Sequence, residues 1–137
     1  MEIQTFFLAE EITRLSAGRH DVRLAVASVM SYTPETRFPV CFTLPALIVL
    51  RRENICGPTA VHLRFDLVDE DGRSAGRPRR WPVQSAFADG NRFLYIMAKI
   101  AFDFPKPGRY RLDITSQDEL DGPLYHYAID LVPGEER

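Results

Sequence analysis

Residues 61–68 have the sequence VHLRFDLV, in which apolar and polar side chains alternate almost without exception. Successive side chains of a strand point to opposite faces, so this pattern predicts a strand with one buried face. The polar face carries His62, Arg64 and Asp66. Asp71-Gly72 follows and predicts a turn, because glycine accepts a positive φ without a steric penalty. The stretch is typical of an antiparallel sheet with one face toward a core.

The rest of the chain repeats this organisation. Short apolar or alternating runs are separated by Pro, Gly and Asp, which predicts seven or eight strands and a single domain over residues 1–137. We therefore expect an all-β fold, a single antiparallel immunoglobulin-like β-sandwich with at most one short helix near residues 9–17. Pro45 lies inside the apolar run 41–52 and predicts a bulge or an edge position there. The expected core comprises Leu24, Val26, Ile48, Leu63, Phe65, Ile96, Ile100, Tyr110, Leu112 and Ile129.

Composition excludes several classes of protein. The 137 residues carry 17 basic and 19 acidic side chains, a net charge of −2, which gives no field that would favour nucleic acid or an anionic membrane. No apolar run reaches the ~18–20 residues that span a bilayer. The amino terminus, MEIQTFFLAEE, lacks the basic region of a secretory signal. We expect a cytoplasmic protein without membrane or nucleic-acid partners.

No catalytic or metal site can be assembled from the sequence. His62 and Asp66 would lie roughly 13 Å apart along a strand, too far to share a metal ion. A hydrolase in which His62 or His126 acts as the general base is one possible function, but no serine nucleophile motif supports it. Cys41 and Cys56 are expected to be plain thiols. We predict no enzyme activity, no catalytic residues, no metal and no cofactor.

Two charged segments are better explained as solvated turns. Two groups of acidic residues each precede a glycine turn: Asp66, Asp69, Glu70 and Asp71 before Gly72, and Asp118, Glu119 and Asp121 before Gly122. Alternating strands would put the two groups at opposite ends of the fold, so they could not combine as a calcium site. The arginine-rich run 73–80 next to Trp81 resembles a nucleic-acid-binding segment, but the upstream carboxylates cancel much of its charge.

The run 92–104, RFLYIMAKIAFDF, has an unusual outer face. Its even-numbered residues form a core face, yet Phe93, Tyr95 and Met97 on the other side are also large and apolar. Either another segment of the chain covers them, or they contact another protomer or protein. The second alternative makes Phe93, Tyr95 and Met97 a candidate interaction surface and predicts a homodimer, with face-to-face pairing because Pro45 and the Arg51-Arg52 pair would blunt a strand edge.

Two functions remain open from the residues. The first is a non-catalytic protein-interaction or accessory module. The alternative is a β-sandwich that binds a small ligand or carbohydrate through exposed aromatic side chains, with Trp81 and Tyr125 as candidate stacking residues beside Tyr95.

Five segments carry a resemblance to a known family. In order they are LAEE (8–11), Phe38-Pro39 before LPALIVLRR (44–52), LVDEDGR (67–73), FPKPGRYRLDI (104–114) and DGPL (121–124). Together they resemble a family of short bacterial proteins known only as a domain of unknown function, which implies an immunoglobulin-like β-sandwich and no known catalytic residues. The pattern Phe104-x-x-x-Gly108-x-Tyr110 also resembles a corner of immunoglobulin-like folds that the tyrosine locks. Gly18-Arg19-His20 departs from the Gly-Lys turn of such proteins.

Overall fold

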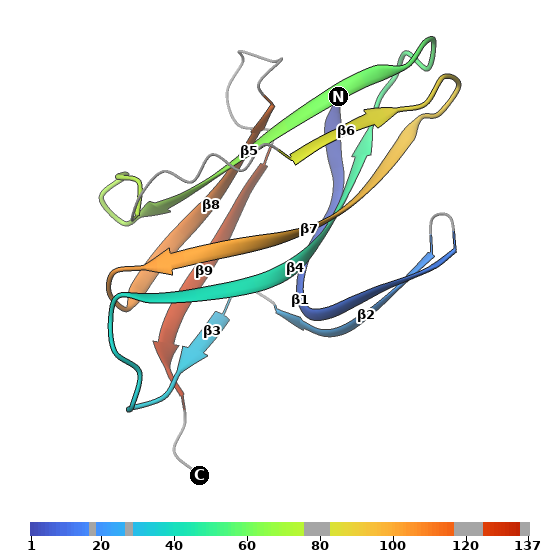
Figure 1. The fold of residues 1–137 in the computed structure, drawn as a ribbon. Helices are drawn as coiled ribbons and strands as arrows, with labels where there is room; N and C mark the ends of the chain where they lie inside the picture. Colours follow the sequence, from blue (N-terminus) through green and yellow to red (C-terminus); the bar gives the residue numbers. More distant parts are fainter. Residues whose placement is uncertain (17–18, 27–28, 76–82, 117–124, 135–137) are drawn as a thin grey trace.

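A computed structural model describes residues 1–16, 19–26, 29–75, 83–116 and 125–134. These residues form nine strands (Figure 1). The strands are β1 (Glu2–Ser16), β2 (Arg19–Val26), β3 (Val29–Tyr32), β4 (Val40–Arg51), β5 (Thr59–Asp69), β6 (Val83–Phe87), β7 (Phe93–Phe104), β8 (Gly108–Ser116) and β9 (Tyr125–Pro133). They belong to two sheets, ordered β2-β1-β4-β7 and β3-β9-β8-β5-β6. The expected all-β composition is confirmed.

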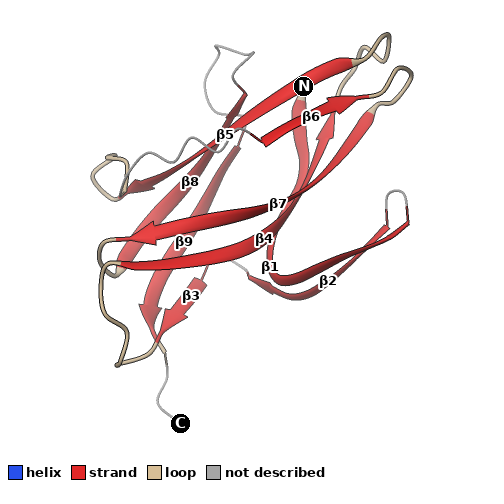
Figure 2. Cartoon of the chain, viewed as in Figure 1, coloured by secondary structure: helices blue, strands red, loops and turns tan. Residues whose placement is uncertain are grey.

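Residues 9–16, where the sequence allowed at most one short helix, form no helix. Residues 9–16 are the second half of β1, and Figure 2 shows no helix among the described elements. The apolar positions that suggested a helix instead pair across a hairpin, with Leu8 opposite Val26 and Ile12 opposite Val22. Cross-strand pairing therefore outweighed the local helical spacing. None of the residues that the structure describes forms a helix long and apolar enough to span a bilayer.

The four-stranded sheet divides β1 into two parts. Residues from Glu2 to Leu8 pair with β4, and the ladder ends where Leu8 pairs with Ala46. The next β4 residue is Pro45, which has no N–H to donate. Beyond this point β1 pairs only with β2, and the two form a hairpin that extends past the end of the β1–β4 ladder, called the arm below (residues 9–16 and 19–25; Figure 1). The predicted edge position of Pro45 is confirmed.

The five-stranded sheet contradicts the expected antiparallel immunoglobulin-like sandwich. Its edge strand β3 runs parallel to β9, with Val29 opposite Asp130 and Tyr32 opposite Pro133. The sequence of residues 22–30, VRLAVASVM, alternates as a single strand would, but it is divided between β2 in one sheet and β3 in the other. One continuous run therefore supplies strands to both sheets, and the sheet that receives β3 is mixed. The prediction of a single antiparallel sandwich is wrong.

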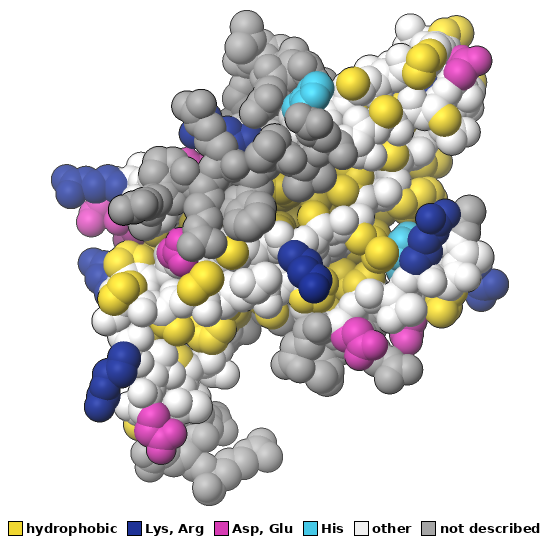
Figure 3. Space-filling model, in the orientation of Figure 1, with side chains coloured by type: hydrophobic (Ala, Val, Ile, Leu, Met, Phe, Trp, Pro, Cys, Tyr) yellow, Lys and Arg dark blue, Asp and Glu magenta, His cyan; other side chains and the backbone are white. Residues whose placement is uncertain are grey.

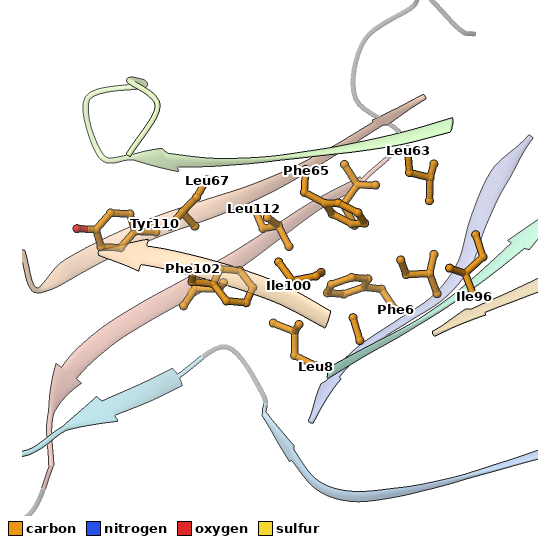
Figure 4. Close-up of a cluster of buried hydrophobic side chains, with 14 of the residues drawn as sticks. Phe6, Leu8, Leu63, Phe65, Leu67, Ile96, Ile100, Phe102, Tyr110 and Leu112 are labelled. Atoms are coloured by element: carbon orange, nitrogen blue, oxygen red, sulfur yellow. The ribbon is translucent and has the colours of Figure 1, made fainter. Parts of the chain in front are cut away.

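A common apolar core lies between the two sheets. Phe6 and Leu8 from β1 and alternate residues of β7 meet alternate residues of β5 and β8 (Figure 4). The predicted core residues Ile48, Leu63, Phe65, Ile96, Ile100, Tyr110, Leu112 and Ile129 are all buried. The side chains of Leu24 and Val26 lie outside those that the structure describes. Strand alternation thus identified the buried faces even though the sheet arrangement was wrong.

Candidate functional site: a groove between the arm and β7

The four-stranded sheet is apolar on both faces: on the inner face toward the core, and also on the outer face. In β4, Ala46, Ile48 and Leu50 belong to the core, whereas Leu47 and Val49 point to the opposite face and are still only 6% and 7% exposed. On β7, Met97 lies opposite Leu47 and Tyr95 lies opposite Val49. An apolar layer therefore continues on the outer side of the sheet, and its surface-exposed members are on β7.

The three residues of the candidate interaction surface are exposed together. Phe93 is 39% exposed, Tyr95 44% and Met97 49%. Their side chains lie on one face of β7, because they are two residues apart. Phe93, Tyr95 and Met97 thus lie together on the outer face of β7, as the sequence predicted.

The arm faces this surface across a groove. The ring of His20 in β2 lies 5.9 Å from the ring of Tyr95, at an interplanar angle of 34°. The groove has a volume of about 510 Å³. Its walls include Arg14 and His20 from the arm and Asn91, Phe93, Tyr95 and Met97 from β7 and the turn before it. In the space-filling view, hydrophobic side chains gather between β7 and the arm, with a histidine and basic side chains at the margin (Figure 3).

The groove carries positive charge. Arg14 and His20 form a cross-strand pair of the arm, and no carboxylate is among the residues that line the groove. Lys99 follows Met97 on the same face of β7 and is exposed. Arg14 and Lys99 form no ion pair with any carboxylate in the described part of the chain. Sequence reasoning missed Arg14 and His20, because only the folding of the arm brings them to β7.

The aromatic residues proposed for ligand stacking do not assemble. Tyr125 is partly buried against the core, and its ring lies 5.8 Å from the ring of Phe6. Tyr95 lies on the outer face of the other sheet. Trp81 is outside the described residues. The structure therefore leaves Phe93 and Tyr95 as the exposed aromatic residues at the groove.

A histidine–carboxylate pair lies elsewhere, on the polar face of the five-stranded sheet. His126 Nδ1 is 2.6 Å from Asp113 Oδ1, and the two residues are opposite each other on β9 and β8. Arg111 donates to both oxygens of Asp113, over 2.7 and 3.1 Å. Asp113 also raises the pKa of Arg111 through the hydrogen bond and the opposite charge. Among the described residues His126 forms no hydrogen bond with a hydroxyl or a thiol.

The corner before β8 has the predicted locking contact. The hydroxyl of Tyr110 donates to the backbone oxygen of Lys106 over 2.5 Å. Burial raises the pKa of the Tyr110 hydroxyl. Gly108 has φ +144°, and Glu70 Oε1 would lie 3.1 Å from a Cβ at this position. The tyrosine corner is the part of the immunoglobulin-like expectation that the structure retains.

The acidic residues near this corner stabilise turns. Asp69 Oδ1 accepts hydrogen bonds from the backbone N–H groups of Asp71 and Arg73, and Glu70 Oε1 accepts one from the N–H of Arg109. The end of β5 lies beside the start of β8, since Asp69 pairs with Tyr110. The other acidic group, 118–121, follows the far end of β8 and lies outside the described residues. The predicted separation of the strand ends is confirmed.

Arg52 has a structural role that the sequence did not indicate. It is 7% exposed, and its guanidinium donates to the backbone oxygens of Asn91, Ile55 and Ala88 and to the hydroxyl of Thr59. The guanidinium also lies over the ring of Phe87, 4.7 Å from its centre. Arg52 therefore ties the 53–58 loop to the turn before β7, which forms one end of the groove. Its expected role in blunting a strand edge is not what the structure shows.

Arg51 and the two cysteines lie at the surface. Arg51 forms ion pairs with Glu2 and Glu53, and their hydrogen bonds raise its pKa. Cys41 and Cys56 are exposed and form no disulfide.

Comparisons with known proteins do not identify the chain. No family model matches the sequence, and no curated protein matches it significantly, so the resemblance to short bacterial proteins stays a prediction. A solved structure of a family 123 glycoside hydrolase from Clostridium perfringens aligns with 85% of this chain and 24% of that chain, at 12% identity and a TM-score of 0.37. The chain thus spans about a quarter of that hydrolase, and a likeness of this degree does not indicate a shared fold or activity.

Proposed function

We propose that this chain is a non-catalytic interaction domain that binds a segment of a partner protein in the groove between the arm and β7. The observation that carries the proposal is the exposure of Phe93, Tyr95 and Met97 side by side on the wall of a groove of about 510 Å³. A contiguous exposed apolar surface on a folded domain marks a site of interaction.

The energetics favour a partner there. Burial of a large apolar side chain stabilises by roughly 1.5–3 kcal/mol relative to full exposure. Tyr95 and Met97 already lose about half of their surface to the fold, so a partner would gain the remaining part at each position. The buried Leu47 and Val49 support Met97 and Tyr95 from β4, which gives the partner a firm surface rather than a loop.

Two other functions receive less support. A small-ligand or carbohydrate site would use Tyr125 as a stacking residue, and the ring of Tyr125 is partly buried and packs against Phe6. For a hydrolase, His126 hydrogen-bonds Asp113 but no hydroxyl or thiol of the described residues that it could activate. The homodimer stays a prediction, and the groove is also the surface that a second copy would use.

Peptide display tests the proposal. The purified full chain is used to select from a random library of displayed 12-residue peptides, beside a Tyr95→Ser/Met97→Ser variant. The control is Val132→Ser, which changes an exposed apolar residue of β9, in the other sheet. Circular dichroism and thermal unfolding show that all three are folded.

The expected result is a family of peptides enriched by the parent chain and by the control, and lost with the groove variant. The proposal fails if the parent chain enriches no peptide, or if the groove variant enriches the same peptides as the parent.

A further inference from the structure

The strand that carries the exposed apolar residues is also an edge strand. In the order β2-β1-β4-β7, β7 has one hydrogen-bonded neighbour, β4, over its whole length from Phe93 to Phe104. Within the described residues, the backbone groups on the other side of β7 pair with no strand. A twelve-residue edge presents a row of N–H and C=O groups that can accept another strand.

The two halves of this edge differ in how well they are protected from pairing with another strand. Charged residues and short length are the usual means by which proteins keep an edge strand from pairing. On the outer face, Lys99 and Asp103 occupy the second half of β7, whereas Phe93, Tyr95 and Met97 occupy the first half. The unprotected half is therefore the half that borders the groove.

The opposite edge of the same sheet limits what can enter. β2 is the other edge strand, and it approaches β7 through the contact between His20 and Tyr95. The two edges meet through side chains and are not hydrogen-bonded to each other. An occupant of the groove thus lies between an unpaired backbone edge on β7 and the side chains of the arm.

The cations near the groove determine which sign of charge a bound peptide should carry. Arg14 on the arm and Lys99 on β7 are exposed cations without a carboxylate partner in the described residues, and the groove lining contains no carboxylate. At physiological ionic strength such charges act over about 8 Å. A segment with negative charge gains from both, and a segment with positive charge is repelled.

We propose that the first half of the β7 edge, Phe93–Met97, accepts an extended acidic peptide as an added strand. This rests on the proposed function of the groove and states the chemistry of its partner. Backbone hydrogen bonds to the edge supply affinity, and alternate apolar side chains of the peptide pack against Phe93, Tyr95 and Met97. Lys99 lies on the same face of β7 as Met97, and Arg14 lines the groove on that side. Carboxylates that Arg14 and Lys99 attract therefore lie on the same face of the added strand as its apolar side chains, before and after them.

The charge is tested with two fluorescent eight-residue peptides, both acetylated and amidated. The Val–Glu peptide has the sequence Glu-Thr-Val-Thr-Val-Thr-Glu-Thr, which puts both Val and both Glu residues on one face of a strand. The Val–Lys peptide has Lys in place of Glu, so the two differ only in the sign of their charge. Fluorescence anisotropy with the full chain should show binding of the Val–Glu peptide at least about tenfold tighter than that of the Val–Lys peptide. An Arg14→Gln/Lys99→Gln variant should remove most of this difference. Equal binding of the two peptides, or absence of binding of the Val–Glu peptide, overturns the proposal.

The added strand is tested by backbone methylation. In a strand pair, N–H groups at alternate residues point to the neighbour. We therefore compare Val–Glu peptides that are N-methylated at every Val and Glu residue or at every Thr residue. The expected result is that one methylated peptide loses binding and the other retains it. Retention by both, or loss by both, contradicts strand addition.

The last controls separate this proposal from the proposed function and from self-association. A peptide selected by display serves as the positive control in the same assay. If it binds through Tyr95 and Met97 but the Val–Glu peptide does not, the acidic-strand proposal is wrong and the proposed function stands. Sedimentation at 1–100 µM, about the range of weak dimers, identifies a second copy as the occupant if a dimer forms that Tyr95→Ser/Met97→Ser dissociates. That result also overturns the acidic-strand proposal.

Discussion

His20 and Tyr95 belong to the two opposite edge strands of one sheet, yet their rings lie 5.9 Å apart. The sheet β2-β1-β4-β7 therefore curls until β2 approaches β7. The curl depends on the arm, which leaves β4 at Pro45 and is then free to turn. A flat sheet of the same four strands would leave Phe93, Tyr95 and Met97 on an open face, whereas the curled sheet places them on the wall of a groove.

The contact between His20 and Tyr95 should hold the arm in place. We expect Tyr95→Ala to increase amide hydrogen exchange several-fold in residues 9–16, because the arm loses its described ring contact with β7. Exchange in β5 and β8 should not change, since they lie in the other sheet. Val132→Ala is the matched control. Unchanged exchange in the arm would show that the ring contact does not position it.

The two adjacent arginines should differ strongly in their effect on stability. Arg52→Ala removes four hydrogen bonds and leaves three backbone oxygens without this donor, so the free energy of unfolding should fall by about 3 kcal/mol. Arg51→Ala should leave the urea unfolding midpoint nearly unchanged, because its ion pairs are at the surface. Equal effects of the two substitutions would contradict the anchoring role of Arg52.

The corner hydroxyl of Tyr110 should contribute a single hydrogen bond. Tyr110→Phe keeps the packing of the ring and removes the donor to Lys106, so the free energy of unfolding should fall by about 1 kcal/mol. Tyr95→Phe, which changes an exposed tyrosine, is the control and should have no measurable effect in urea unfolding. A similar loss in both variants would argue against a locking contact.

Alkaline pH should destabilise the protein through two tyrosines. Burial raises the pKa of Tyr110 and of Tyr127. The folded state therefore favours the neutral, protonated tyrosine side chains. Their contribution to the free energy of unfolding is complete below the ordinary tyrosine pKa of about 10 and is lost as pH rises through the raised pKa.

A Tyr110→Phe/Tyr127→Phe variant tests this link. In urea unfolding at several pH values above about 9, its free energy of unfolding should fall less steeply with pH than that of the parent. The same slope in both proteins would assign the alkaline loss of stability to other groups.

The sequence predicted local structure well where alternation was strong. Strand β5 and the core faces of β7 and β8 follow from side chains that repeat every second residue, and they are buried as expected. The exposed trio on β7 was also visible, because large apolar residues occupied the face that should be polar.

Other features depend on contacts between distant segments. The spacing of Leu8, Ile12 and Leu15 fits a helix turn as well as a strand, and only pairing with β2 decides between them. The parallel pairing of β3 with β9 joins residues about 100 positions apart, and no local sequence pattern indicates such a pairing. For the same reason His20 and Arg14 could not be assigned to the groove, and Arg52 could not be recognised as buried.

The central claim is that the first half of β7 is an unpaired edge that a peptide completes. Amide hydrogen exchange by NMR, without and with the Val–Glu peptide, tests it most directly. Without peptide, amides from Phe93 to Met97 should alternate between slow exchange toward β4 and fast exchange toward the open edge. The peptide should slow the fast set. Uniformly slow exchange in the free protein, or fast amides that the bound peptide leaves unprotected, would contradict the claim.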